Sequence, residues 1–335
     1  RFWPMSTPAR PKQLLALASD RPLIRDTVAR AQRLTGRDRL RILTGAHLVE
    51  PFRAVLTELP DSAYLIEPRA RGTAPVLAWA AWTALKDDPD AVIVSLHADH
   101  RVHPEGAFVD LLADAVALAS ATGDLLTVGV PPTRPETGYG YIQPGDVVAT
   151  EGDTDARRVE EFHEKPDAER AADYVAAGYL WNTGLFVWRA DRFLEEVREH
   201  APAIGSALER LEDGDVEGYF DAVPSISVDH AVLERSGRVA VVDATFEWDD
   251  VGSWSALRRT RPADDHGNVS VGPVHAVEST GTIVASDGDP VVLWGVDDLV
   301  VVQSSGVTFV TTRERAPHLK DLLEELPDEL RNPDR

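Results

Sequence analysis

Residues 91–100 read AVIVSLHADH, an apolar run that ends in Asp99 and His100. A strand whose residues are nearly all apolar, without alternating polar ones, is typical of a sheet covered on both faces. The runs 73–85 before it and 106–121 after it are long enough to form helices. We therefore expect an α/β fold with Asp99 and His100 just past the carboxyl end of a strand, where open α/β sheets bind ligands.

The same alternation of short apolar runs and helical runs extends along the first 130 residues. It predicts strands at 40–43, 63–66, 91–96 and 125–130, and helices at 22–34, 48–56, 73–85 and 106–121. Strands and helices that alternate with short connections imply a parallel sheet with right-handed crossovers. Longer strands are expected at 138–143, 157–163 and 180–188.

A polar connector, PADDHGNV, follows Arg261, and the pattern of apolar residues changes after it. Beyond it, short apolar pieces are broken by Gly, Asp and Ser and show no helical period. This pattern indicates a small all-β element, either a few β-helix coils or a small sandwich. A final amphipathic helix is expected at 316–326. We predict two domains, residues 1–261 and residues 262–335.

The net charge of −22 argues against nucleic acid and anionic membranes as partners. The chain has no cysteine, which excludes disulfides, thiolate metal sites and cysteine nucleophiles. No apolar run is long enough for a membrane span, and no signal peptide is apparent, so we expect a cytoplasmic protein. An anionic substrate would need local positive charge and a divalent cation, and two of the four lysines, Lys12 and Lys165, lie in the most motif-like stretches.

Two carboxylates at different strand ends suggest a metal site. Asp99 follows the strand 91–96, and Asp250 lies in WDDVGSW at 248–254. Alone, Asp99 reads equally well as a turn residue, and an aspartate pair such as Asp249 and Asp250 is usually a turn, but together Asp99 and Asp250 could hold one Mg²⁺, which prefers hard oxygen ligands shared with phosphates. Arg1 and Lys12 flank a proline-interrupted loop before a helix, and fixed cations in such loops hold phosphates.

A second group of polar residues lies in the middle of the chain. Glu164 and Lys165 close a strand in EEFHEKPD, where the lysine can hold a phosphate while the glutamate accepts from hydroxyls. A surface ion pair before a proline turn explains the same residues. Asn182 lies inside the apolar strand 180–188, and a buried amide needs partners, so it either pins neighbouring backbone or contacts a ligand hydroxyl.

These stretches together resemble one family, the sugar-1-phosphate nucleotidylyltransferases, and within it the mannose-1-phosphate guanylyltransferases. The resemblance covers nearly the whole chain in order, and its motifs are RFWPMSTPARPKQLLAL, EPRARGTAP, ADH, RPETGYGYI, FHEKP, YLWNTGLFVW, SISVDHAVLE and WDDVGSW. It implies a Rossmann-like mixed sheet flanked by helices, followed by a small left-handed β-helix that is often used in dimer contacts.

The resemblance also implies roles for individual residues. Arg1 and Lys12 would hold the nucleotide phosphates. Glu67 would bind the base, with Thr73 and Ala74 nearby. Asp99 and Asp250 would hold the catalytic Mg²⁺. The sugar pocket would be lined by Gly140, Glu164 and Asn182, with Lys165 on the sugar phosphate.

The chain departs from the family pattern in three places. The first strand and the glycine-rich loop that precede the arginine of the family's opening motif are absent from the sequence, which leads us to expect a segment missing before Arg1. Gly72 stands where the family commonly has Asn or Asp. His97 stands where Pro is usual.

The expected reaction is transfer of GMP from GTP to mannose 1-phosphate, giving GDP-mannose and pyrophosphate, in a homodimer. Two alternatives remain open: a related enzyme that uses glucose 1-phosphate with UTP or dTTP, or a catalytically silent subunit that binds sugar nucleotides. Glu67 favours guanine, because a carboxylate accepts from the two adjacent donors N1–H and N2–H₂, whereas uracil suits an amide.

Overall fold

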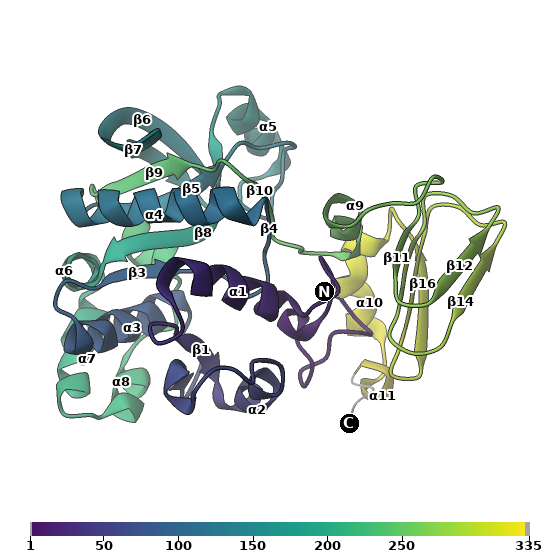
Figure 1. Ribbon diagram of the computed structural model, residues 1–335, viewed down its shortest axis with the longest axis horizontal. Coiled ribbons are helices and arrows are strands. Elements are labelled where there is room, and N and C mark those ends of the chain that lie inside the picture. The colour runs from purple at the N-terminus through teal and green to yellow at the C-terminus, as the bar shows by residue number, and fades with distance from the viewer. Residues whose placement is uncertain (1, 332–335) are drawn as a thin grey trace.

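The computed structural model describes residues 2–331, so Arg1 lies outside the described residues. An α/β part and a smaller β part lie side by side in Figure 1. The α/β part contains a mixed sheet whose six strands run in the order β3, β8, β5, β9, β7, β6. These strands are β3 (Val92–Ser95), β5 (Leu125–Val130), β6 (Gly140–Glu151), β7 (Thr154–His163), β8 (Leu180–Arg189) and β9 (Val239–Asp243).

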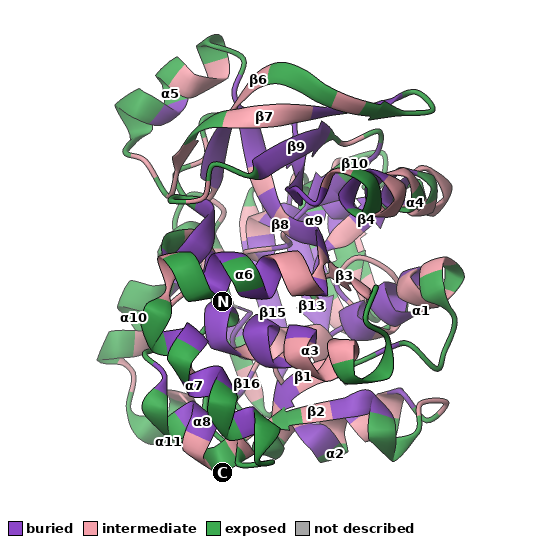
Figure 2. Cartoon of the chain, turned by 90° about the vertical axis from the view of Figure 1, so that its left-hand side faces the viewer, coloured by how far each residue is buried: buried purple, intermediate pink, exposed green. Residues whose placement is uncertain are grey.

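The six-stranded sheet is buried on both faces because successive side chains of its central strands point in opposite directions. On β8, Phe186 and Trp188 pack into one core with the helices α3, α6, α7 and α8, while Leu185 and Val187 pack into another with α4. The helices of the α/β part are α1 (Leu23–Thr35), α2 (Ala46–Val55), α3 (Thr73–Asp87), α4 (Glu105–Thr122), α5 (Ala168–Ala176), α6 (Ala190–His200), α7 (Pro202–Glu212), α8 (Val216–Ala222) and α9 (Leu257–Thr260). Figure 2 shows the buried inner faces of these elements in purple.

The remaining strands of the α/β part form two small sheets. β1 (Ile42–Gly45) and β2 (Tyr64–Glu67) pair in parallel, and β4 (Arg101–His103) pairs antiparallel with β10 (Glu247–Asp249). The sequence predicts one parallel sheet from the first four strands, but β1 and β2 stand apart. In addition, β8 lies antiparallel between β3 and β5. The mixed sheet implied by the family resemblance is therefore confirmed, and the all-parallel arrangement is wrong.

A cleft separates β1 from β3. Its walls include Ile42 of β1, Val92 of β3, Val28 of α1 and Val76 of α3. The cleft continues to the ends of the strands, where the polar residues discussed below lie.

The β part consists of two layers. β11 (Val269–Val271), β13 (Ile283–Ser286) and β15 (Leu299–Ser304) are parallel, and β16 (Val307–Thr312) adds antiparallel to β15. The second layer is the parallel pair β12 (Val274–Val277) and β14 (Val291–Trp294), and the helices α10 (Leu319–Glu325) and α11 (Asp328–Arg331) follow. Parallel strands stacked in two layers match the expected β-helix-like element, and its left-handedness stays a prediction.

The N-terminal segment packs against the β part. Phe2, Trp3 and Leu15 share a core with Val269 and Phe309. The rings of Trp3 and Phe309 meet edge to face with centroids 5.5 Å apart. This shared core fixes the loop that carries Lys12, although the sequence assigns the loop to the other domain. The boundary at residue 261 stays a prediction.

Candidate active site

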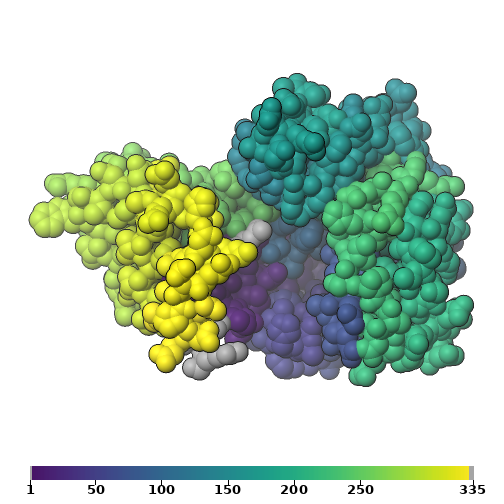
Figure 3. Space-filling view, turned by 180° about the vertical axis from the view of Figure 1, so that it is seen from behind, coloured from purple at the N-terminus to yellow at the C-terminus, as the bar shows by residue number. Residues whose placement is uncertain are grey.

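The cleft of about 1270 Å³ holds six of the residues that the sequence singled out. Its walls include Thr73, Gly140, Glu164, Lys165, Asn182 and Asp250. They come from five parts of the chain: the start of α3, the start of β6, the turn after β7, the strand β8, and the turn after β10. In Figure 3, a hollow is visible where the teal, green and purple regions of the chain meet.

Lys12 contacts both of the aspartates that we predicted as metal ligands, Asp99 through its carboxylate and Asp250 through its backbone carbonyl. Its Nζ lies 3.1 Å from Asp99 Oδ2, and it also donates a hydrogen bond to the backbone carbonyl of Asp250. Gln13 Nε2 donates to the same Asp99 oxygen at 3.3 Å. The side chains of Lys12 and Asp99 are 14% and 19% exposed, so this pair is partly shielded from water. The structure thus brings three predicted residues from distant segments to one place.

Only one of the two adjacent aspartates in WDDVGSW faces the cleft. Asp249 is buried, accepts from Arg259 Nε at 2.6 Å and from the Val251 amide at 2.8 Å, and so stabilises the turn. Asp250 lines the cleft, and its Oδ1 accepts from the Tyr139 hydroxyl at 2.6 Å. Burial, followed by the neighbouring Asp250 charge, raises the pKa of Tyr139, which therefore stays protonated and donates.

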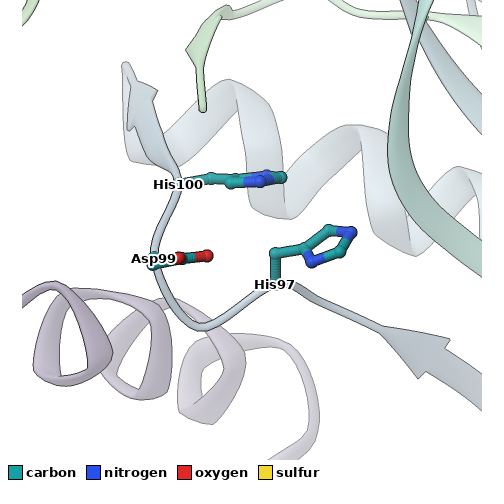
Figure 4. Close-up of side chains that lie close together, drawn as sticks. All are labelled: His97, Asp99 and His100. Atoms are coloured by element: carbon teal, nitrogen blue, oxygen red, sulfur yellow. The ribbon is translucent and has the colours of Figure 1, made fainter. Parts of the chain in front are cut away.

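His97, Asp99 and His100 form a second group of metal-ligand types, shown in Figure 4. One donor atom of each lies within 4.8 Å of the others. Burial holds the pKa of His100 well below its ordinary value, and its Nδ1 accepts from Trp248 Nε1 at 3.0 Å. A neutral imidazole that accepts at Nδ1 carries its proton on Nε2 and has no lone pair left for a metal. His100 therefore fits poorly as a ligand, whereas the carboxylates of Asp99 and Asp250 are the hard oxygen donors that Mg²⁺ prefers.

Gly140 leaves room for the polar side chains of Glu164 and Asn182. It pairs with Asn182 in the ladder between β6 and β8. A Cβ on Gly140 would lie 2.7 Å from Glu164 Oε2 and 3.4 Å from Asn182 Cβ, so a larger residue would displace the glutamate. Lys165 has φ = +47°, a left-handed conformation that is uncommon for a non-glycine residue, and it forms an ion pair with Glu164. Its side chain is 63% exposed and so is open to an incoming anion.

The predicted base-binding residues lie along one edge. Glu67 ends β2 beside Gly45, and it is not among the residues that line the cleft. Burial raises the pKa of Glu67, and the nearby His47 opposes the shift. Thr73 lines the cleft and accepts from the Val228 amide at 2.9 Å through its hydroxyl, whereas Ala74 is fully buried.

Gly72 is explained by its surroundings. It has φ = +81°, and a Cβ there would lie 2.5 Å from the backbone oxygen of Ile226. The loop before α3 is held against the segment 226–228, since Ile226 N donates to Arg71 O at 2.9 Å and Ala74 N to Ile226 O at 3.2 Å. Only glycine fits this close approach without strain.

For three residues of the cleft, the sequence analysis predicted no role in the site. Tyr139, His97 and Asp229 all line it. The motifs that contain Tyr139 and Asp229 were part of the family resemblance, but no role was attached to either residue. The buried position of Asn182 predicted that it needs partners, and one of them is Asp229, whose Oδ1 accepts from Asn182 Nδ2 at 3.1 Å.

An α/β sheet whose strand ends surround two lysines and several carboxylates is suited to transferring a phosphate-linked group. The chain belongs to the nucleotidyl transferase family, whose model matches residues 1–266, and residues 272–326 match the MannoseP isomerase/GMP-like β-helix domain. It is 37% identical to the mannose-1-phosphate guanylyltransferase ManC of Salmonella typhimurium, over 97% of this chain and 70% of that protein. It is 36% identical to the alginate biosynthesis protein AlgA of Pseudomonas putida, over 98% and 70%.

A solved structure agrees with these relatives. A mannose-1-phosphate geranyltransferase from Thermus thermophilus superposes with a TM-score of 0.87 at 34% identity, covering 96% of this chain and 94% of that one. The chain is thus an enzyme of the nucleotidyltransferase kind. Among the described residues, no helix has the length and apolar character needed to cross a membrane.

Proposed function

We propose that this protein transfers GMP from GTP to mannose 1-phosphate, giving GDP-mannose and pyrophosphate. One observation carries the proposal. Glu164 and Lys165 line the same cleft as Asp250, the backbone carbonyl of Asp250 accepts from Lys12, and Lys12 also pairs with Asp99. The same chain is similar from end to end to mannose-1-phosphate guanylyltransferases.

The reaction needs little acid–base chemistry. A phosphate oxygen of the sugar phosphate forms a bond to the α-phosphorus of GTP, and the bond from that phosphorus to pyrophosphate breaks. Because a phosphate dianion is already a nucleophile, the protein's work is positioning and charge neutralisation. We assign Lys165 to the phosphate of mannose 1-phosphate and Lys12, with Arg1, to the triphosphate.

Enzymes of this family generally depend on a divalent metal, and we propose Mg²⁺ here. The fit rests on the donor set, since Asp99 and Asp250 offer carboxylate oxygens and Lys12 contacts both residues, Asp99 at its carboxylate and Asp250 at its backbone carbonyl. Mg²⁺ held there would neutralise charge on the phosphoryl group. Lys12 already places a positive charge beside Asp99, which supports a cation site at this position.

Guanine selectivity is assigned to Glu67, with Thr73 and Ala74 beside it. Glu67 lies at the carboxyl end of β2, and α3 begins with Thr73. An ionised carboxylate has only acceptors and matches the two adjacent donors of guanine. Its raised pKa reflects partial burial, which strengthens a hydrogen bond to the base.

The test measures pyrophosphate release for every pairing of a set of nucleoside triphosphates with a set of sugar 1-phosphates. We expect GTP with mannose 1-phosphate to exceed every other pair by about tenfold or more in kcat/KM. A preference for UTP or dTTP with glucose 1-phosphate would replace this proposal by the first alternative. Binding without turnover of any pair would favour the silent regulatory subunit.

A homodimer is proposed from an apolar patch on the β part. Val292 and Trp294, two residues apart on β14 and so on one face of that strand, are 68% and 76% exposed, and Trp294 Nε1 donates to Glu278 at 3.3 Å. Exposed apolar patches of this kind mark interaction sites. Trp294→Glu should halve the mass measured by light scattering, whereas Val148→Glu, at an exposed valine of β6, should leave it unchanged. A wild-type monomer would refute the dimer.

A cytoplasmic location stays a prediction.

A further inference from the structure

Asp229 is a carboxylate of the cleft that the proposed reaction does not use. It begins a short π-helical turn, Asp229–Leu233, and lines the cleft together with Glu164 and Asn182. Turns of π-helix are rare and occur often at functional sites. Burying a carboxylate is unfavourable unless partners compensate for the lost contact with water. Stability of the fold therefore does not by itself explain the position of Asp229.

Neighbouring groups fix the direction of the Asp229 carboxylate. Asn182 Oδ1 accepts from Thr127 Oγ1 at 2.9 Å and from the Gly184 amide at 3.3 Å, which leaves its Nδ2 to donate to Asp229 Oδ1 at 3.1 Å. This donor pattern determines which way the amide of Asn182 points. The backbone beside Asp229 is also held, because the Val228 amide donates to Thr73 Oγ1 at 2.9 Å.

Glu164 lies close enough for its charge to affect Asp229. Burial first, and the Glu164 charge second, raise the pKa of Asp229 to about 6. The absence of a side chain on Gly140 allows Glu164 to approach Asn182, which itself contacts Asp229. Two carboxylates and an amide therefore share one wall of the cleft.

This wall repels phosphate groups and attracts hydroxyls. Two acceptor-only groups next to each other match two neighbouring hydroxyl groups of a sugar ring, each of which can donate one hydrogen bond. The positive charge that a phosphate needs is supplied next to this wall by Lys165, whose side chain is mostly exposed. The sugar ring, and not the triphosphate, fits against Asp229.

We propose that Asp229 is a specificity-determining residue for the sugar: its carboxylate accepts from one hydroxyl of the hexose beside the hydroxyl that Glu164 receives. The inference rests on the proposed function and extends it by naming a residue that reads the sugar. It commits Asp229 to the hexose. The ribose of the nucleotide, which Thr73 would bring nearby, is the competing occupant.

The experiment compares the wild-type protein with Asp229→Asn, and Glu234→Gln serves as the matched control. Glu234 is an exposed carboxylate just after the same turn. It lies away from the cleft and forms an ion pair with His230, with 2.7 Å between the two groups. We expect Asp229→Asn to lower kcat/KM for mannose 1-phosphate by about tenfold to a hundredfold, with KM for GTP changed less than about twofold. Calorimetric binding of mannose 1-phosphate should show the same loss without turnover.

Deoxy analogues identify the contact. The wild-type protein should discriminate against the 2-, 3- and 4-deoxy forms of mannose 1-phosphate. Asp229→Asn should lose most of its discrimination against one of them only, because the partner of that hydroxyl is gone. A purely structural role would leave the pattern of discrimination unchanged while lowering all rates.

Three outcomes would overturn the proposal: a rise in KM for GTP alone, equal losses for both substrates, or an unchanged pattern with the analogues. The first would assign Asp229 to the ribose. Failure of the proposed function is separate, since it shows in the wild-type protein as a preference for another sugar phosphate or nucleotide.

Discussion

Replacing Asp229 by asparagine should stabilise the protein while it weakens sugar recognition. Burial and the nearby Glu164 raise the pKa of this carboxyl from its ordinary value near 3.8 to about 6. One pKa unit corresponds to about 1.4 kcal/mol, so the ionised group costs the fold at most about 3 kcal/mol. Because the side chain is only partly buried, we halve this figure to about 1.5 kcal/mol. Asparagine keeps an oxygen for Asn182 and removes the charge.

The effect depends on pH in a defined direction. Well below the unfolded pKa of about 3.8 the carboxyl is protonated in both folded and unfolded chains and costs nothing. Stability is lost as the pH rises from about 4 to about 6, because the carboxyl ionises in the unfolded chain before it ionises in the folded one, and above about pH 6 the cost is constant. The free energy of unfolding of Asp229→Asn should therefore exceed that of the wild-type protein by about 1.5 kcal/mol at pH 8 and by about half of that at pH 5.

Thermal unfolding provides the assay. For an α/β part of this size, about 1.5 kcal/mol corresponds to a rise in Tm of about 2–3 °C at pH 8, shrinking towards 1 °C at pH 5. Glu234→Gln, an exposed carboxylate, should shift Tm by much less at both pH values. A Tm at or below the wild-type value at pH 8, or a gain that does not shrink at pH 5, would show that contacts within the protein already compensate the charge.

The remaining predictions concern residues assigned from the motifs. Asp99→Asn and Asp250→Asn should each remove most turnover and weaken Mn²⁺ binding measured by paramagnetic resonance; near-normal rates at saturating Mg²⁺ would exclude that residue as a ligand. Lys165→Ala should raise KM for mannose 1-phosphate by about tenfold to a hundredfold and leave that for GTP nearly unchanged, and equal losses would contradict its assignment. Glu67→Gln should shrink the preference for GTP over ITP, expected to be about tenfold to a hundredfold in the wild-type protein, towards unity. An unchanged ratio of kcat/KM would mean that Glu67 only orders the loop after β2.

Local patterns predicted most elements but not how distant strands pair. The apolar runs gave β3 and β5 nearly to the residue. The same runs led us to expect these strands in one parallel sheet, whereas β8, from the middle of the chain, lies antiparallel between them. Pairing depends on contacts between residues far apart in sequence, and periodicity in a short window holds no information about them.

The residues of the candidate site were likewise predicted only in part from the sequence. Chemistry at strand ends predicted Asp99 and Asp250, a proline-interrupted loop before a helix predicted Lys12, and the structure brings the three together, although their roles remain predictions. The importance of Asp229 depends on its contact with Asn182, a residue 47 positions earlier in the chain. The sequence alone could indicate that Asn182 needs partners, because an amide in an apolar strand is costly when unpaired, but it could not identify them.

The charges around the cleft account for the expected need for a metal. Each lysine of the site already has a carboxylate partner, Lys12 with Asp99 and Lys165 with Glu164. The carboxylates of Asp250 and Asp229 also line the cleft, so among these groups the negative charges outnumber the positive ones. A triphosphate would enter this field against repulsion, in a chain that is strongly acidic overall. A divalent cation held by Asp99 and Asp250 would reverse the balance on the proposed nucleotide side and leave Lys12 to hold phosphate oxygens, while the proposed sugar side would keep the negative wall that accepts from hydroxyls.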